Sequence, residues 1–365
     1  MLLTEFPPEL LLSLPRYLRS IEDLLSLSST CRTLYRTCAE PDPKIIPGLV
    51  AASGRIFFRP HPHFVIAATA RQLGDWAVKH DDHRYLLEVA IQGGVEKLLE
   101  LAIDVAELTM EDIRKLHAFK SDVINPLNRR LDVASGPASG DPWTVCNDPE
   151  TTLLSWVIYG ELFHHSFELA YSPLPEHKPL SSVTRYKWFV YCMPDVNSFN
   201  YMEFEDQPPF FKEYDQKKDD RFQQLSMSQA MREMLNRLLW EHELQSTPSF
   251  QEIPGASREE FIRIVMHMGM KSLAILVPGG PERLREDLDR IAKGIIALEV
   301  GGGGDDTSLL KFVDDRWLGA PRFTLETDVG FSLWANWMGE DEDEDDSKLL
   351  MEAIRSPPQR KVPVE

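Results

Sequence analysis

The chain has 365 residues, of which 43% are hydrophobic and 10% aromatic, and it carries a formal net charge of −19 at pH 7. This length and composition suit about two conventionally packed domains, and they exclude a chain that is disordered throughout. The negative charge opposes binding to nucleic-acid backbones and to anionic membrane surfaces, and the sequence has no uncharged apolar run of about eighteen residues that could span a bilayer.

The first stretch of the chain, residues 1–40, predicts three short helices. Pro8 suits the first position of a helix, and leucines follow it at helical spacing, at positions 10, 11, 14 and 18. Ser20 is followed three residues later by Asp23, which resembles a capping box for a second helix, and Thr30 can start a third. A unit of this size seldom buries enough surface to fold alone. The leucines therefore need cover from the rest of the chain or from another protein.

Within this stretch, Pro-x-Glu-Leu is followed by Leu, then by Asp-Leu and then by Cys-Arg-x-Leu. This order resembles the F-box, the docking module of ubiquitin-ligase substrate receptors, and the resemblance extends over residues 1–40. In that family, three helices dock onto a Skp-type adaptor, which is bound in turn to a cullin scaffold. The resemblance implies an adaptor-binding surface formed by the residues at the motif positions, which are Pro7, Pro8, Glu9, Leu10, Leu14, Leu18, Asp23, Leu24, Leu27, Cys31, Arg32 and Leu34.

One position departs from the F-box pattern. Pro15 stands where the family usually has an aliphatic residue, and a proline inside a helix removes a backbone hydrogen bond at a cost of about 3 kcal/mol. We therefore expect the first helix to kink at Pro15. The alternative to an F-box is an amphipathic, leucine-rich segment that packs only within its own chain.

Residues 41–338 predict a helical domain, so we expect the whole chain to be all-α. A Pro-Asp-Pro hinge precedes this domain, and helices with recognisable starts and stops are predicted at 84–92, 95–106, 109–119, 149–171, 182–193, 228–245, 257–277 and 281–299. Parts of the domain weakly resemble the region that follows the F-box in fungal F-box proteins of unassigned substrate. No Trp-Asp, kelch or leucine-rich repeat is present to indicate where a target would bind.

Residues 195–226 form an insert that has many charges and seven aromatic residues but no periodicity. Because aromatic residues are typical anchors of protein interfaces, we expect the insert to contact a target through Phe204, Phe210, Phe211 and Tyr214. The alternative is that these side chains fold back as local core. The sequence further predicts an acidic loop at 339–347, a short helix at 348–355 and a disordered tail at 356–365.

Several histidines and acidic residues could ligate a metal in principle: His61 with His63, His164 with His165, and Asp81, Asp82 and His83. No spacing brings them together, adjacent residues on a helix point about 100° apart, and the chain has no His-Glu-x-x-His motif. We therefore expect neither a metal nor another cofactor. The chain also has no Gly-x-Ser-x-Gly elbow, and the apolar residues before Cys192 predict a raised thiol pKa, which argues against a ubiquitin-carrying thiol.

The F-box resemblance implies a non-catalytic subunit. The expected function is that of substrate receptor in an SCF-type cullin ubiquitin ligase, which binds a Skp-type adaptor through the F-box and a protein target through the helical domain. Four cysteines without a regular framework, and no secretory leader, predict a location in the cytoplasm or the nucleus. One alternative is an F-box scaffold protein that binds the adaptor without promoting ubiquitination. Another is a small-molecule enzyme in the helical domain, which the missing motifs disfavour.

Overall fold

The computed structural model describes residues 6–38, 41–53, 61–135, 138, 149–165, 180–192, 252–253, 258–301 and 356–358. Every regular element within these residues is helical, which confirms the predicted all-α fold. In this described part, no helix is both long enough and apolar enough to cross a membrane. The predicted insert at 195–226, the acidic loop at 339–347 and the short helix at 348–355 lie outside the described residues.

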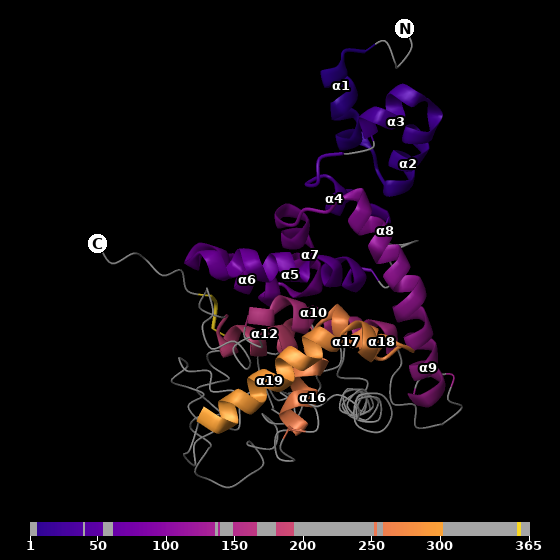
Figure 1. Cartoon of the computed structure of the whole chain (residues 1–365). Helices are drawn as coiled ribbons and strands as arrows, with labels where there is room; N and C mark the ends of the chain where they lie inside the picture. Colours follow the sequence, from indigo (N-terminus) through magenta and orange to yellow (C-terminus); the bar gives the residue numbers. More distant parts are fainter. Residues whose placement is uncertain are drawn as a thin grey trace.

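The N-terminal residues form a narrow end that projects from the rest of the molecule (Figure 1). It consists of α1 (Pro8–Ser13), the 3-10 turn η2 (Leu14–Tyr17), α2 (Ile21–Thr30) and α3 (Arg32–Cys38). The Ser20 hydroxyl accepts a hydrogen bond from the Asp23 amide at 3.1 Å, as the sequence predicted for the start of α2. The prediction that Thr30 starts the third helix is wrong, because α2 continues through Thr30 and an extended Cys31 separates it from α3.

The first helix breaks near Pro15, as its sequence predicted. The α-helical part ends at Ser13, and the chain continues as the 3-10 turn that contains Pro15. Because proline has no amide proton, it cannot extend the α-helical hydrogen-bond pattern. Its carbonyl instead accepts a bond from the Leu18 amide at 3.3 Å, and its ring is buried.

The helix α4 (Ile46–Ser53) connects the N-terminal end to the body. The Ile21 amide at the start of α2 donates to the Ser53 hydroxyl oxygen at 3.0 Å, and the same oxygen lies 2.9 Å from the Glu22 carboxylate. Ile21 and Leu24 also belong to the same hydrophobic core as Ile46. The N-terminal helices are therefore packed onto the body rather than attached by a loose linker.

The centre of the body is α10 (Pro149–Leu162). All side chains from Leu153 through His164 are buried, so this helix is covered on every side. It packs against four helices, which are α5 (His63–Lys79), α9 (Asn125–Ser135), α12 (Ser182–Cys192) and α17 (Met270–Ile275). α10 ends at Leu162, where a turn at Phe163 interrupts the helix that was predicted over 149–171. His164 and His165 are again helical, and residues 166–171 lie outside the described residues. At this end the Glu161 carbonyl is in contact with the His164 ring, which provides a side-chain partner for a terminal carbonyl group.

A glycine allows α5 and α10 to approach closely. A Cβ atom at Gly74 would collide with the Leu162 carbonyl oxygen, so no larger residue fits at this crossing. On the other side of α5 lie α6 (Asp81–Gln92) and α7 (Gly94–Val105), which also contact α12 and correspond to two of the predicted helices. These helices together form the layered core of the body (Figure 1).

A long helical rod lies along one side of the body (Figure 1). It begins with α8 (Met110–Phe119), passes through a π-helical turn at Lys120–Ile124, and continues as α9. The sequence predicted only the part to Phe119, because Asn125-Pro126 is ordinarily a helix boundary. The widened turn, in which the Asn125 amide donates to the Lys120 carbonyl, accommodates a proline that lacks an amide proton.

The last described helices are α16 (Arg258–Met266), α17, α18 (Gly280–Arg283) and α19 (Arg285–Gly301). The prediction of one helix over 257–277 is wrong, because Gly269 adopts a φ of 63° and separates α16 from α17. A side chain at this position would be strained, and its Cβ would also collide with the Glu161 carboxylate. The helix predicted at 281–299 is likewise interrupted, at Leu284.

Candidate functional site

The residues expected to bind an adaptor differ widely in exposure. Pro7, Pro8, Glu9, Leu10, Asp23 and Arg32 are exposed, Leu14, Leu18, Leu27 and Cys31 are partly buried, and Leu24 and Leu34 are buried. The role of these positions in adaptor binding stays a prediction, and the side chains of Leu24 and Leu34 are not exposed in this structure. Leu24 belongs to the hydrophobic core that includes Ile46 of α4, and Leu34 is buried on α3.

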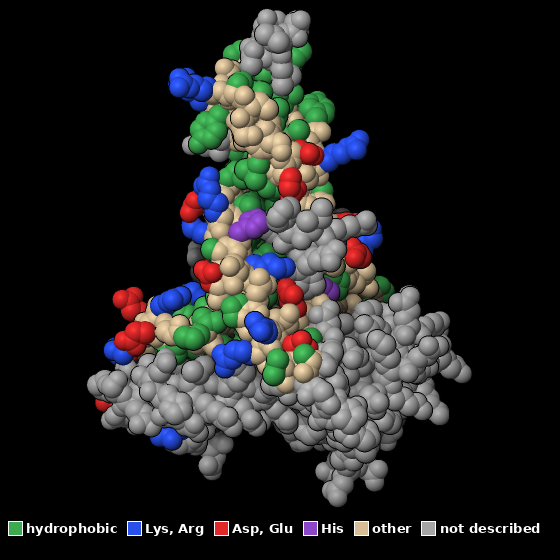
Figure 2. Space-filling model, turned by 90° about the vertical axis from the view of Figure 1, so that its right-hand side faces the viewer, with side chains coloured by type: hydrophobic (Ala, Val, Ile, Leu, Met, Phe, Trp, Pro, Cys, Tyr) green, Lys and Arg blue, Asp and Glu red, His purple; other side chains and the backbone are tan. Residues whose placement is uncertain are grey.

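Other apolar side chains cover the surface of this unit. Leu10, Leu12, Tyr17, Leu25 and Tyr35 are between 52% and 79% exposed, and they make up five of the eight exposed large hydrophobic residues among the described residues. Figure 2 shows hydrophobic side chains on this narrow end of the molecule. Such a concentration on a small unit is typical of a surface that binds another protein.

Sequence reasoning named only one of these five, Leu10. Consecutive residues on a helix point about 100° apart, so the run Leu10-Leu11-Leu12 cannot face one core. Leu11 is buried while its neighbours are exposed, and Leu25 is exposed beside the buried Leu24. The runs of adjacent leucines indicated that some of these side chains must be exposed. Only the packing of the helices decides which leucine is buried.

Charged residues of both signs are exposed on the same unit as these leucines and tyrosines. Glu9, Arg19, Asp23, Arg32 and Arg36 are all exposed on the N-terminal unit. Among protein interfaces, a polar rim around an apolar centre is the common arrangement. The N-terminal unit therefore exposes apolar side chains together with charges of both signs.

The residues expected to contact a target, Phe204, Phe210, Phe211 and Tyr214, lie outside the described residues. Their role stays a prediction.

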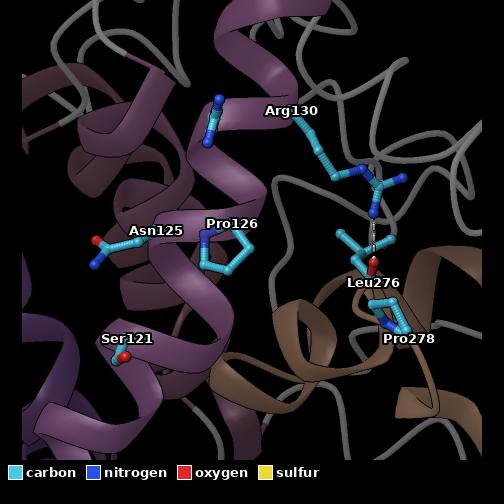
Figure 3. Close-up of a pocket in the computed structure, with 7 residues that line it drawn as sticks. Ser121, Asn125, Pro126, Arg130, Leu276 and Pro278 are labelled. Carbon is cyan, nitrogen blue, oxygen red and sulfur yellow. Dashed lines mark hydrogen bonds between the residues drawn. The ribbon is translucent and has the colours of Figure 1, made fainter.

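Within the described part, a surface groove of about 790 Å³ lies between α9 and the turn that follows α17 (Figure 3). Its lining residues are Ser121, Asn125, Pro126, Arg129, Arg130, Leu276 and Pro278. Arg130 reaches across the groove and donates to the Leu276 carbonyl at 3.0 Å (Figure 3). This lining contains no carboxylate, histidine or cysteine for acid–base or metal chemistry.

The possible metal ligands named from the sequence have separate surroundings. The His83 ring stacks on Trp76 with ring centroids 4.1 Å apart, and Asp81 accepts a bond from Arg84 at 3.4 Å. Neither these residues nor His61, His63 and Asp82 belong to the cluster of three possible metal ligands that the described residues contain.

That cluster consists of Asp75, His164 and His165. One Asp75 oxygen lies 3.0 Å from His164 Nε2 and 2.8 Å from His165 Nε2, and the candidate ligand atoms all lie within 4.8 Å of one another. The expectation that adjacent histidines diverge is wrong here, because both follow the turn at Phe163 and their ring centroids are only 3.9 Å apart. Sequence reasoning missed Asp75 completely, since it lies on α5, far from the histidines in the sequence.

A second polar group adjoins this cluster. One carboxylate oxygen of Glu161 accepts a bond from Arg71 at 2.6 Å, and the other accepts the Met270 amide at 2.8 Å. Glu161 therefore links α5 and α10 to the first turn of α17. Burial, together with the charge of Arg71 and the proximity of His165, lowers the pKa of His164 to about 4.

The described cysteines show no activating surroundings. Burial raises the pKa of the Cys192 thiol well above its ordinary value, as the sequence predicted, and the thiol donates to the Ile91 carbonyl at 3.4 Å. Burial also raises the pKa of Cys38. For both thiols, burial therefore favours the protonated form.

Comparison with known proteins gives no further assignment, since no family model, no curated protein and no solved structure matches the chain. The surface chemistry of the N-terminal unit is thus the main guide to function.

Proposed function

We propose that residues 6–38 dock on a Skp-type adaptor, and that the chain acts as a substrate receptor of an SCF-type cullin ubiquitin ligase. The observation that carries the proposal is the set of exposed leucines and tyrosines on an end that projects from the body. The order of F-box-like residues along the same helices supports it independently. A protein target would be held by the helices and segments that follow.

The apolar surface is large enough to matter for binding. Full burial of a leucine side chain contributes roughly 1.5–3 kcal/mol, so side chains that are already half-buried contribute on the order of 1 kcal/mol each. The five exposed residues then provide several kcal/mol toward an association cost of roughly 4–15 kcal/mol. Polar contacts at the rim would supply the remainder.

The connection between the N-terminal helices and the body also suits a receptor. The bond from the Ile21 amide to Ser53 and the shared core of Leu24 and Ile46 hold the N-terminal helices on the body. A receptor works by tethering its target near a ubiquitin-loaded enzyme, which raises the effective concentration of the two. A firm connection restricts the positions that a bound target can occupy, and so favours transfer.

The test is co-purification of the full chain with a Skp-type adaptor. We expect Leu10→Ala combined with Leu25→Ala to weaken adaptor binding by about tenfold or more, since a loss of 1.4 kcal/mol corresponds to a factor of ten. Leu86→Ala combined with Val89→Ala is the matched control, because these residues are similarly exposed but lie on α6. That control should bind like the wild type.

Leu24 is unsuitable for this test. Truncating a buried leucine typically costs about 2–5 kcal/mol of stability, so lost binding would reflect a damaged fold. The proposal fails if the wild-type chain binds no adaptor, or if the Leu10 and Leu25 variant binds as well as the control. If the adaptor binds but no cullin co-purifies and no protein changes its ubiquitination, the chain is a scaffold protein rather than a receptor.

A further inference from the structure

The cluster of Asp75, His164 and His165 raises a question of protonation. The Nδ1 atom of His164 lies 2.8 Å from the Glu161 carbonyl oxygen, which can only accept a hydrogen bond. Nδ1 therefore carries a proton, and Nε2 is the ring nitrogen that can bind an ion.

The Nε2 atoms of both histidines lie against one carboxylate oxygen. His164 Nε2 lies 3.0 Å from an Asp75 oxygen, and His165 Nε2 lies 2.8 Å from the same oxygen. The ligand atoms of Asp75, His164 and His165 all lie within 4.8 Å of one another. Two imidazole nitrogens and a carboxylate oxygen that converge in this way form a possible metal site.

We propose that Asp75, His164 and His165 bind a divalent transition-metal ion through a carboxylate oxygen and the two Nε2 atoms, and that Zn²⁺ fits best. Zinc takes nitrogen ligands at about 2.0–2.1 Å and carboxylate oxygens at about 2.0–2.2 Å in a tetrahedral arrangement. Neighbouring ligand atoms in such a tetrahedron are about 3.3 Å apart. The observed contacts of 2.8 and 3.0 Å need only small side-chain movements to reach this spacing.

The surroundings of the three ligands suit a metal site. Metal-binding histidines almost always donate their other ring N–H to a carbonyl or carboxylate, as His164 does to the Glu161 carbonyl. The guanidinium of Arg71 is paired with the Glu161 carboxylate at 2.6 Å, so the Asp75 carboxylate makes the local charge negative. The Asp75 side chain is 45% exposed, which leaves a path for the ion and room for a water molecule in the fourth position.

Ligand chemistry separates zinc from the commoner cytosolic cations. Imidazole nitrogen suits zinc, copper, nickel and iron, whereas magnesium and calcium prefer oxygen ligands. The site should therefore not bind Mg²⁺, even when Mg²⁺ is in large excess. The alternative occupant is a proton shared between Asp75 and the histidines, in which case no metal binds there.

The experiment uses the full chain after removal of metals with a chelator. Zn²⁺ binding is followed by calorimetry, and Co²⁺ by the visible absorption bands that tetrahedral nitrogen and oxygen ligation produces. We expect one ion per chain, and at least a tenfold loss of affinity in Asp75→Asn and in His165→Gln, since even outer-shell changes cost about 10–100-fold. His80→Gln, which replaces an exposed histidine outside the cluster, is the control and should bind normally.

Thermal unfolding gives a second measurement. Zn²⁺ should raise the Tm of the wild type and of His80→Gln, because an ion that binds only the folded state stabilises it, and it should leave Asp75→Asn unchanged. Asp75→Asn keeps the shape of a half-exposed side chain, so this variant should fold. It therefore tests the proposal even if His165→Gln does not fold. The proposal is overturned if neither Zn²⁺ nor Co²⁺ binds, or if Asp75→Asn binds them as tightly as the control.

Discussion

Lys187 on α12 forms an ion pair with Glu88 on α6, and its ammonium group also donates to the Ser356 carbonyl at 2.9 Å. The Lys187 side chain is 2% exposed and that of Glu88 is 22% exposed, so the positive charge is the more deeply buried of the two. Gln92 donates to the same Ser356 carbonyl at 3.0 Å. Lys187 and Gln92 thus attach Ser356, a residue of the predicted disordered tail, to the body. Residues 359–365 of that tail lie outside the described residues.

The unequal burial predicts unequal effects of mutation. Glu88→Gln leaves a buried ammonium without its counter-charge and should lower the free energy of unfolding by about 3 kcal/mol. Lys187→Met leaves a carboxylate that water can reach, so it should cost less, and the double variant should resemble Lys187→Met. Urea unfolding measures all three. Glu100→Gln, in the exposed pair with Lys97, is the control and should change stability by less than about 0.5 kcal/mol. Equal losses for the two single variants would contradict the prediction.

Two helical glycines should respond in opposite ways to alanine. Gly74→Ala places a Cβ against the Leu162 carbonyl and should destabilise the protein by about 1–3 kcal/mol through overpacking. At Gly48, on α4, a Cβ would meet only Ile103 at 3.9 Å, an ordinary contact. Gly48→Ala should therefore be neutral or stabilise by up to about 1 kcal/mol, because alanine favours helix. Thermal unfolding compares the two variants, and a stable Gly74→Ala would show that α5 and α10 are not in close contact.

The capping box at the start of α8 predicts a pH dependence. The Thr109 hydroxyl donates to the Asp112 carboxylate at 2.6 Å and lowers the pKa of Asp112 below its ordinary value of 3.8. The unfolded chain then binds more protons than the folded chain between these two pKa values, so this stabilisation is present above pH 3.8 and is lost as the pH falls through the folded pKa. Asp112→Asn should cost about 1 kcal/mol at pH 7 and progressively less in acid. Denaturant unfolding of both proteins across this range checks the convergence, and a constant difference would refute it.

The cysteines should differ in reactivity. Cys192 is buried with a raised pKa, whereas Cys31 is partly exposed between α2 and α3. Because the thiolate is the reactive form, native protein treated with iodoacetamide should be labelled at Cys31 and not at Cys192. Peptide mass spectrometry distinguishes the two sites. In urea both should react, and rapid labelling of Cys192 without urea would show that α12 opens readily.

Local features of this protein could be predicted from its sequence. The break at Pro15 follows from a missing amide proton, and the caps at Ser20 and Thr109 form between residues three positions apart. The all-α fold follows from helical periodicity. These features depend on the backbone and on near neighbours, so no knowledge of distant residues was needed. The apolar character of residues 1–40 was equally clear from the sequence, and with it the expectation that the rest of the chain or another protein covers these leucines.

Tertiary packing decided the rest. Leu24 and Leu25 are chemically identical neighbours, yet one is buried and the other exposed, because α3 and α4 cover only one side of α2. His165 meets Asp75 across 90 positions of sequence, because the close crossing at Gly74 brings α5 against the end of α10. The sequence contains Asp75, the histidines and the leucines, but their directions and distances arise only when helices far apart in the chain pack against one another.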